Sequence, residues 1–329
     1  MKKRSVKLII ALSLILAVAA AIVIIKLAAT NEDKSVVKGE TTEISGTTQQ
    51  AVAAIPEDAD GIYASADGQA YYYYRSGNKV LNAGWYDMSD TLKVEVDSDG
   101  HAVTKYDSKA GHLYQYSADA GKWVVATEPT YEIDKNTYCF DTDGNLIRSQ
   151  IAGDDKNGYY FVDSTGCKTT SEEIQMAVEL VMENTDSSMS DDEKLHTCFN
   201  KIRSYEYERD YATVDSAAQF SEFAVYAMTN EVANCYKYAA AFACVATVLG
   251  NDARVICGQM PAYYGDGLTD HSWTELWDDA TNSWLVYDAC LQREEYYGEN
   301  RAKYFPGESP VDSTAQLMIE NGKVTWKWI

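Results

Sequence analysis

The pattern of hydrophobic and polar positions changes three times along the chain. Residues 8–25 carry no charged side chain, and Ser13 is their only clearly polar residue, which is typical of an apolar helix. Residues 31–59 are polar and contain no aromatic side chain. Residues 60–170 alternate aromatic and polar positions between Asp- and Gly-rich turns, which predicts β-strands. Residues 171–329 begin with helical periodicity and return to alternation, which predicts helices followed by strands.

The first 30 residues are set apart before the fold is considered. Basic residues precede the apolar stretch and only Lys26 follows it closely, so the rest of the chain is expected outside the membrane. The stretch at 8–25 is short for a membrane span and long for a signal-peptide core. A signal peptide and an N-terminal membrane anchor both stay open for residues 1–30, with the anchor favoured. Residues 31–59 have too few apolar side chains to offset chain entropy and are expected to form a flexible linker.

A short repeat runs through residues 60–170. Its glycines are separated by 23, 21, 23 and 22 residues (Gly77, Gly100, Gly121, Gly144 and Gly166). An alternating aromatic segment and an Asp-rich turn precede the glycine in residues 94–100, 138–144 and 159–166. This pattern predicts a β-hairpin of about 22 residues with glycine at a position of positive φ. One hairpin is unstable alone in water, so neighbouring hairpins are expected to stack.

Helical signals begin at Ser171. Residues Glu172–Asn184 place apolar side chains at helical spacing, and Ser190 with Glu193 predicts a capped helix start. A third, Ala-rich helix is expected to begin at Asn234 and to stop at Gly250, with Cys235 in its first turn. The helix dipole and the unpaired N–H groups of that turn stabilise a thiolate, which a nucleophilic cysteine requires.

Three predicted strands follow this helix, at residues 253–258, 271–277 and 283–288. The last two form a hairpin around Asn282, which places His271 and Asp288 at the same end of the antiparallel pair. A helix that packs on this sheet can bring Cys235 within reach of His271. Cys235, His271 and Asp288 are therefore the candidate catalytic residues, as nucleophile, general base and acid, and orienting carboxylate.

These segments together resemble the transglutaminase-like superfamily, which has a papain-like fold. The resemblance covers about 140 residues from Ser190 onward and rests on four ordered motifs: Cys235 with Tyr238 and Ala239, residues 250–254 (GNDAR), residues 271–273 (HSW) and residues 284–288 (WLVYD). It implies an α+β domain over 171–329, in which the helix that bears the cysteine packs on an antiparallel sheet. The family often has Gly two residues before the cysteine and Pro after the aspartate, where this chain has Ala233 and Ala289. The first difference concerns the backbone N–H groups that would bind an oxyanion at Cys235.

The resemblance implies acyl transfer on peptide amides through a cysteine thioester. Transfer to water would make the protein a cysteine peptidase or amidase, and transfer to a lysine amine would make it a transglutaminase. Outside the membrane, the expected substrates are surface proteins or peptidoglycan peptides. The alternative is a surface adhesion or wall-binding scaffold whose transglutaminase-like domain binds peptide without turnover. Tyr205 and Tyr207 are possible cleft residues; otherwise they belong to the core.

The middle region resembles the aromatic hairpin repeats of bacterial choline- and glucan-binding proteins. The matching segments are residues 84–86 (GWY), 138–144 (YCFDTDG) and 160–166 (YFVDSTG). Those families repeat a Gly-Trp pair in nearly every unit, whereas here only Trp85 follows a glycine and Trp123 follows Lys122. Recognition of a quaternary ammonium group needs several aromatic rings around one cation, so choline binding is not expected. The region is interpreted as a rigid stalk or as a binder of cell-wall glycan through Trp85 and the tyrosines.

The charge of the chain limits the kinds of molecule that it is expected to bind, and its cysteine content limits its cross-links. The formal charge is −22, with 50 acidic and 28 basic residues, which argues against nucleic acid because phosphates must be neutralised by Lys and Arg. Without the nucleophile, six of the seven cysteines remain; they could all be reduced or form three disulfides, such as Cys139–Cys167 and Cys257–Cys290. No cofactor is expected. No metal site is expected either, because CxxC and HxxxH spacings are absent and the aspartates of the Asp-rich turns lack a complete calcium-loop pattern.

Overall fold

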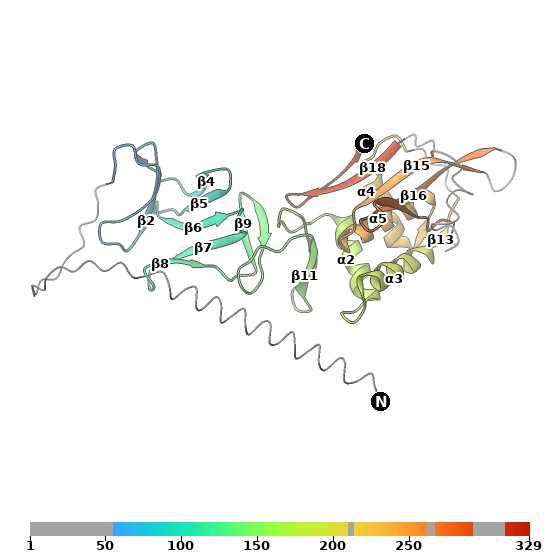
Figure 1. The fold of residues 1–329 in the computed structure, drawn as a ribbon, viewed down its shortest axis with the longest axis horizontal. Helices are drawn as coiled ribbons and strands as arrows, with labels where there is room; N and C mark the ends of the chain where they lie inside the picture. Colours follow the sequence, from blue (N-terminus) through green and yellow to red (C-terminus); the bar gives the residue numbers. More distant parts are fainter. Residues whose placement is uncertain (1–54, 210–213, 262–266, 292–312) are drawn as a thin grey trace, which may run out of the picture. The chain divides into compact units, whose positions relative to one another are not determined.

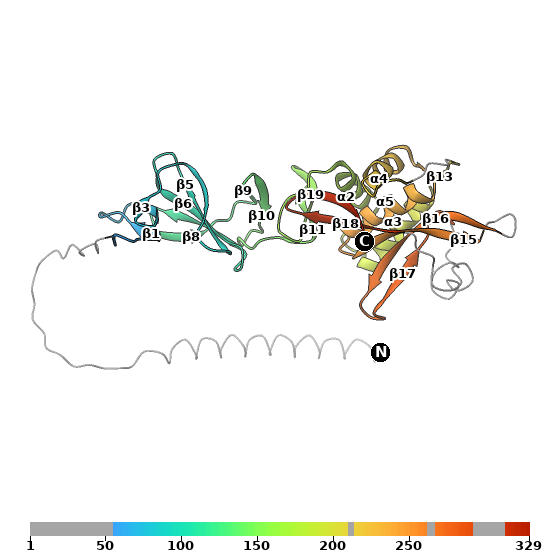
Figure 2. The same cartoon turned by 90° about the horizontal axis from the view of Figure 1, so that it is seen from above.

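A computed structural model describes most of the chain beyond the N-terminal segment (Figures 1 and 2). The described residues are 55–209, 214–261, 267–291 and 313–329. The predicted signal peptide or anchor at 1–30, with its apolar stretch at 8–25, lies outside these residues, as does most of the predicted linker at 31–59. Within the described ranges, none of the helices has the length and apolar character that a membrane crossing needs.

Residues 61–162 form antiparallel β-structure. A three-stranded sheet comes first, made of β1 (Gly61–Ala64), β2 (Tyr71–Arg75) and β3 (Asn78–Lys79). A five-stranded sheet follows, in which consecutive strands pair: β4 (Gly84–Asp87), β5 (Leu92–Val96), β6 (Ala102–Asp107), β7 (His112–Ser117) and β8 (Lys122–Val125). Two separate hairpins complete the region: β9 (Thr130–Ile133) with β10 (Asn136–Cys139), and β11 (Gln150–Asp154) with β12 (Gly158–Val162).

The Asp-rich turns have one shared geometry. In each of the turns that begin at Asp97, Asp141 and Asp163, the aspartate Oδ1 accepts hydrogen bonds of 2.8–2.9 Å from the backbone N–H groups two and four residues later. The glycine of each turn donates its N–H to the carbonyl of that aspartate at 3.0–3.1 Å. The five glycines of the predicted repeat all have positive φ, as expected. The aspartates therefore act as turn acceptors and hold the glycines in the left-handed conformation.

Only some of the strands form separate hairpins. Strands β4 to β8 join into one sheet, because a two-stranded hairpin leaves edges that a neighbouring strand can pair. Aromatic side chains fill the small cores of the region: Tyr73 lies against Val94 and Val96, and Tyr106 lies against Phe140. The predicted hairpin repeat and the resemblance to wall-binding repeats stay predictions.

Replacing Gly144 by alanine is expected to destabilise the protein by about 2–3 kcal/mol. Gly144 has a φ of 78°, and an added Cβ would lie 2.3 Å from Val125 Cγ1 and 2.6 Å from the Ala126 carbonyl oxygen. The strained conformation and the backbone clash add to each other. Gly121→Ala is the matched control, because Gly121 has a φ of 63° but no heavy atom within 4 Å of the added Cβ. Gly121→Ala is expected to lower the free energy of unfolding by about 1 kcal/mol. Urea unfolding measures both variants, and equal losses of unfolding free energy would contradict the close packing at Gly144.

Helices dominate the chain from residue 172 to residue 248. They are α2 (Glu172–Asn184), α3 (Asp191–Arg203), α4 (Gln219–Asn230) and α5 (Cys235–Val248). The predicted bounds of α2 are confirmed, and so is the capping box of α3. Ser190 Oγ accepts the Glu193 N–H at 3.3 Å, and the Glu193 carboxylate accepts the Ser190 N–H at 2.8 Å.

A five-stranded antiparallel sheet lies beside the helices (Figure 2). Its order is β17-β16-β15-β18-β19, with the bounds β15 (Ala253–Pro261), β16 (Leu268–Asp278), β17 (Ser283–Tyr287), β18 (Ser313–Glu320) and β19 (Lys323–Trp328). A small parallel pair, β13 (Glu206–Tyr207) and β14 (Val232–Ala233), leads into α5. The predicted hairpin is confirmed as β16 and β17, with Asn282 at positive φ in its turn. Helices and sheet together make an α+β domain.

Helix α5 is the centre of this domain. It contacts β15 and β16 as well as α2, α3 and α4, and its side chains are buried on several sides, as Ala240, Phe242 and Val245 illustrate. Its alanines let the sheet approach closely, and Thr274 Oγ of β16 donates a hydrogen bond of 2.9 Å to the Ala239 carbonyl. The helix that carries Cys235 is therefore fixed against the strand that carries His271.

The last hairpin of the β region contributes to the core of the helical domain. Phe161 of β12 is 4% exposed and belongs to the same apolar cluster as α2 and α5, with Ile151 and Tyr159 packed against it. The turn between β18 and β19 also reaches this hairpin, because the Gly322 N–H donates to Asp163 Oδ2 at 2.8 Å. Packing therefore continues across residue 170, where the sequence analysis places a domain boundary.

Candidate active site

Cys235 is placed by a tightly specified helix start. Strand β14 ends at Ala233, and the side-chain oxygen of Asn234 accepts the Lys237 N–H at 3.1 Å, so the helix begins at Cys235. The backbone N–H groups of Cys235 and Tyr236 lie in the first turn of α5, where an α-helix offers them no carbonyl partner of its own. Such groups are the donors that an oxyanion beside the sulfur requires.

His271 and Asp288 come together across the β16–β17 hairpin. Both side chains are buried, and His271 Nε2 lies 2.6 Å from Asp288 Oδ2. The other carboxylate oxygen, Oδ1, accepts the Leu291 N–H at 3.2 Å and holds the carboxylate in place. Strand β16 begins at Leu268, three residues before the predicted start at His271, because β15 continues to Pro261 and pairs with this extension. Asp288 follows β17 directly, whereas the predicted strand included it as its last residue.

The His271 imidazole interacts with Asp288 and Cys235 together. Burial would lower the pKa of His271, but the Asp288 carboxylate and a hydrogen bond with the Cys235 side chain outweigh burial, so this pKa is raised. Because Nε2 faces Asp288, Nδ1 is the ring nitrogen that remains for the thiol. A raised imidazole pKa favours the imidazolium form, which is the partner that stabilises a cysteine thiolate.

Buried polar contacts fix the strand beside His271. The ring of Trp273 stacks with the His271 ring at 6.2 Å between centroids and an interplanar angle of 25°. Trp273 Nε1 donates to the Glu275 carboxylate at 3.2 Å, and the Arg254 guanidinium of β15 binds the same carboxylate at 2.7 Å. Glu275 is 3% exposed, and its buried charge is paired with a guanidinium whose side chain is 25% exposed. Glu275 thus links β16 to β15 through its ion pair with Arg254, and the Trp273 ring holds the orientation of the His271 imidazole.

The seven cysteines, all within the described residues, are free thiols. The disulfides considered above, Cys139–Cys167 and Cys257–Cys290, are therefore absent from the structure. Five cysteines are buried, and only Cys235 and Cys290 are partly exposed. Burial raises the pKa of Cys290. Its sulfur nevertheless lies within 4.8 Å of ligand atoms of His271 and Asp288, a proximity that the sequence analysis missed.

The tyrosines that precede β14 have different surroundings. Tyr205 is 3% exposed within the main core, and its carbonyl accepts a hydrogen bond of 2.6 Å from Tyr238 Oη, so it belongs to the core. Tyr207 is half exposed on β13.

In the β region, Trp85 packs on a small core and donates its Nε1–H to the Glu132 carbonyl at 3.2 Å. Trp123 forms an aromatic cluster with Tyr71 and Tyr116.

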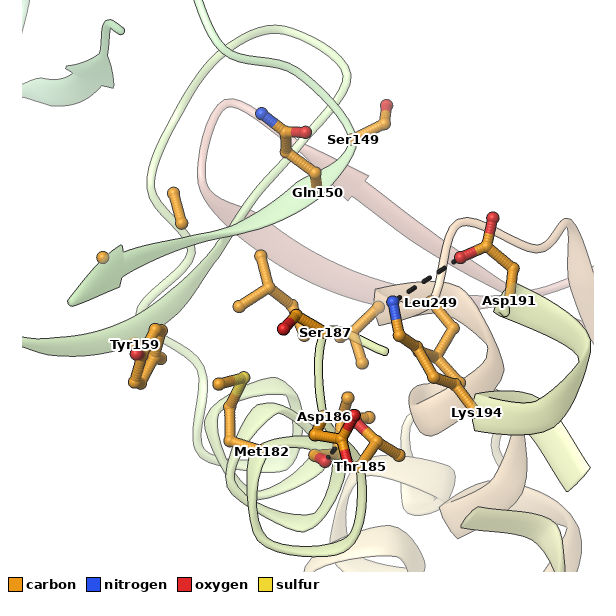
Figure 3. Close-up of a pocket in the computed structure, with 15 residues that line it drawn as sticks. Ser149, Gln150, Tyr159, Met182, Thr185, Asp186, Ser187, Asp191, Lys194 and Leu249 are labelled. Carbon is orange, nitrogen blue, oxygen red and sulfur yellow. Dashed lines mark hydrogen bonds and ion pairs between the residues drawn. The ribbon is translucent and has the colours of Figure 1, made fainter. Parts of the chain in front are cut away.

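A cavity of about 510 Å³ lies elsewhere in the helical domain (Figure 3). Residues of β11, the end of α2 and the start of α3 line it, and its charged groups include the Asp191–Lys194 ion pair of 3.7 Å. The cavity reaches Leu249 at the C-terminal end of α5, whereas Cys235 begins that helix. The rise of an α-helix puts the two ends about 20 Å apart, so this cavity is separate from the candidate catalytic residues.

A comparison with protein families defines the class of this domain. Residues 175–289 match the model of the transglutaminase-like superfamily, and this range contains Cys235, His271 and Asp288. The chain therefore carries a transglutaminase-like domain, which occupies about a third of its length. The matched range begins within α2 and ends just after Asp288.

The similar solved structures share little sequence with this chain. The periplasmic domain of TgpA from Pseudomonas aeruginosa is 18% identical, with a TM-score of 0.28, over 39% of this chain and 45% of that one. A proposed cysteine protease from Cytophaga hutchinsonii is 13% identical, with a TM-score of 0.29, over 48% of this chain and 52% of that one. Alternansucrase in complex with isomaltononaose is 17% identical, with a TM-score of 0.15, over 34% of this chain and 8% of that one. The chain thus spans about half or less of each of these structures. No curated protein matches it.

Proposed function

We propose that the transglutaminase-like domain catalyses thiol-dependent acyl transfer on peptide amides, with Cys235, His271 and Asp288 as its catalytic triad. The observation that carries this proposal is the position of the His271 imidazole. It is hydrogen-bonded to a buried carboxylate at 2.6 Å and interacts with a cysteine at a helix N-terminus. This arrangement supplies the nucleophile, the base and the orienting group that amide cleavage needs.

The chemistry follows from these positions. The Cys235 thiolate attacks the amide carbonyl, and the carbonyl oxygen becomes an oxyanion beside the N–H groups that begin α5. The His271 imidazolium then gives its proton to the departing amine, which leaves a thioester on Cys235. Water or a second amine, deprotonated by His271, attacks the thioester and releases the thiol. The pathway requires no cofactor, because a thioester stores the acyl group.

The setting we propose is the bacterial cell surface. The basic residues before the apolar stretch at 8–25 support a cytoplasmic N-terminus, with the domain outside the membrane or secreted. Surface proteins and peptidoglycan peptides are then the proposed substrates. Binding of cell-wall glycan by Trp85 and by the cluster of Trp123, Tyr71 and Tyr116 would hold the domain near them.

Incubation with a peptide library and a tagged amine tests the reaction directly. Mass spectrometry should detect hydrolysed peptides if water resolves the thioester, and tagged peptides if the amine does. Either product requires the acyl-enzyme, so an adduct of the peptide acyl group on Cys235 should also be found. A non-catalytic scaffold that binds peptide would give neither product nor adduct.

Cys235 should react with iodoacetamide at pH 6 at least about tenfold faster than Cys290, the other partly exposed cysteine. The raised pKa of His271 keeps an imidazolium beside the Cys235 sulfur, whereas burial raises the pKa of the Cys290 thiol. Tryptic peptides quantified over time give both rates. His271→Ala should slow the labelling of Cys235 and leave that of Cys290 unchanged. Equal rates for the two cysteines would favour the scaffold function.

A further inference from the structure

A second group of chemically active side chains overlaps the candidate active site. His271, Asp288 and Cys290 each place one potential metal-ligand atom within 4.8 Å of the other two. The first two side chains are buried and Cys290 is partly exposed. The catalytic steps above use His271 and Asp288 but leave the Cys290 thiol without a function.

The donor atoms select one class of cation. Imidazole nitrogen, carboxylate oxygen and thiolate sulfur together are a poor set for Ca²⁺ or Mg²⁺, which prefer oxygen ligands, and a good set for Zn²⁺. Zinc bonds of about 2.0–2.3 Å place tetrahedral ligands roughly 3.3–3.8 Å apart. The Cys290 sulfur, which lies within 4.8 Å of the other two ligand atoms, needs to approach them by at most about 1 Å. His271 Nε2 and Asp288 Oδ2, now 2.6 Å apart, need to separate by about the same amount. Rotations of these side chains about their χ angles can provide both movements.

A second cluster of potential metal ligands among the described residues is a weaker candidate for a metal site. Asp97, Asp99 and His101 also lie within 4.8 Å of one another, but they contain no sulfur. Asp97 Oδ1 already accepts the N–H groups of Asp99 and His101, and the Asp97 carboxylate also faces the His101 ring at 3.4 Å. The turn itself accounts for this arrangement.

We propose that His271, Asp288 and Cys290 form a binding site for Zn²⁺ that switches the domain off. Binding displaces the thiol proton of Cys290 and the proton shared by His271 and Asp288, and water completes a four-ligand shell. The metal then occupies the imidazole and carboxylate that would serve Cys235. Only the inhibitory consequence rests on the proposed function, because binding itself does not require turnover.

Cobalt titration of the Cys235→Ala protein tests the site without relying on activity. This variant lacks the candidate nucleophile, so a sulfur-to-Co²⁺ charge-transfer absorption must come from another thiolate. We expect this absorption to appear, and to vanish when Cys290→Ser is added. The double variant should also bind Zn²⁺ at least about tenfold more weakly in competition titrations. Cys257→Ala in the same background is the matched control, since Cys257 lies near the site, 3.9 Å from Ser272 Oγ, but outside the ligand set; it should keep the absorption.

Two results would overturn the site. One is a Cys235→Ala protein that binds Co²⁺ without sulfur charge transfer, and the other is an absorption that persists after Cys290→Ser. Inhibition is measured separately, by adding Zn²⁺ to the wild-type protein in the peptide assay and restoring activity with a chelator. A protein that shows the absorption but has no amide activity would retain the metal site and lose the proposed function, so the two failures are distinguishable.

Discussion

Replacing Cys235 by alanine is expected to lower amide hydrolysis and amine transfer by about 10³-fold or more. The substitution removes the only atom to which the acyl group can be attached, and the oxyanion donors at the start of α5 cannot replace a nucleophile. The fold should persist, because Cys235 is partly exposed and Asn234 caps the helix independently of the sulfur. Initial rates with the library peptides and a thermal unfolding curve measure the two effects.

Cys139→Ala is the matched control for this prediction. It removes a thiol from β10, in a part of the chain that contributes nothing to the candidate site, so the rates should stay at their wild-type values. Substantial turnover in the Cys235→Ala protein would remove the cysteine from the mechanism. A loss of folding together with activity would instead show that the sulfur is structural.

Asp288→Asn should reduce kcat/KM by about 10²- to 10⁴-fold while the protein stays folded. Asparagine keeps an oxygen for the Leu291 N–H, which Asp288 Oδ1 now accepts at 3.2 Å. It loses the negative charge beside His271 Nε2, so the raised pKa of His271 should fall. The imidazolium–thiolate pair then becomes less favourable, and iodoacetamide labelling of Cys235 at pH 6 should slow as well.

The Asp288→Asn substitution should also change how the free energy of unfolding depends on pH. A histidine whose pKa is raised by folding stabilises the native state fully below its ordinary value of 6.5, and this contribution is lost as pH rises through the raised value. The stability difference between wild type and Asp288→Asn should therefore shrink on the alkaline side. Asp270→Asn serves as control, because Asp270 is exposed and contacts Gln259. A similar loss of kcat/KM in both variants would argue against an orienting function for Asp288.

Local signals explain why much of the helical domain was predictable. The apolar spacing of residues 172–184, the pair Ser190 and Glu193, and the alternation on both sides of Asn282 are properties of short segments. The approach of His271 to Asp288 follows from the hairpin register, which a turn residue largely determines. The sequence alone therefore predicted that His271 and Asp288 lie at the same end of the hairpin.

Contacts between distant segments account for what was missed. Strand β18 pairs with β15 across residues 262–312, and no local pattern specifies that partner. The hairpin of β18 and β19 did carry a signal, the Asn321–Gly322 turn, which was overlooked. Phe161 joins the helical core through packing that alternation cannot predict. Cys290 reaches His271 only because the chain turns directly after Asp288.

The docking of β11 and β12 on α2 determines where this protein can be divided. A fragment that starts at residue 171 would lack Phe161 and uncover apolar side chains of α2 that are now buried, such as Ile174 and Val178. It would also leave the Gly322 amide without the Asp163 carboxylate that accepts it. The smallest fragment that keeps this packing around the candidate active site thus includes a hairpin that belongs, by its sequence, to the preceding β region. Recombination that exchanges the β region for that of another protein would have to break the chain before Ser149.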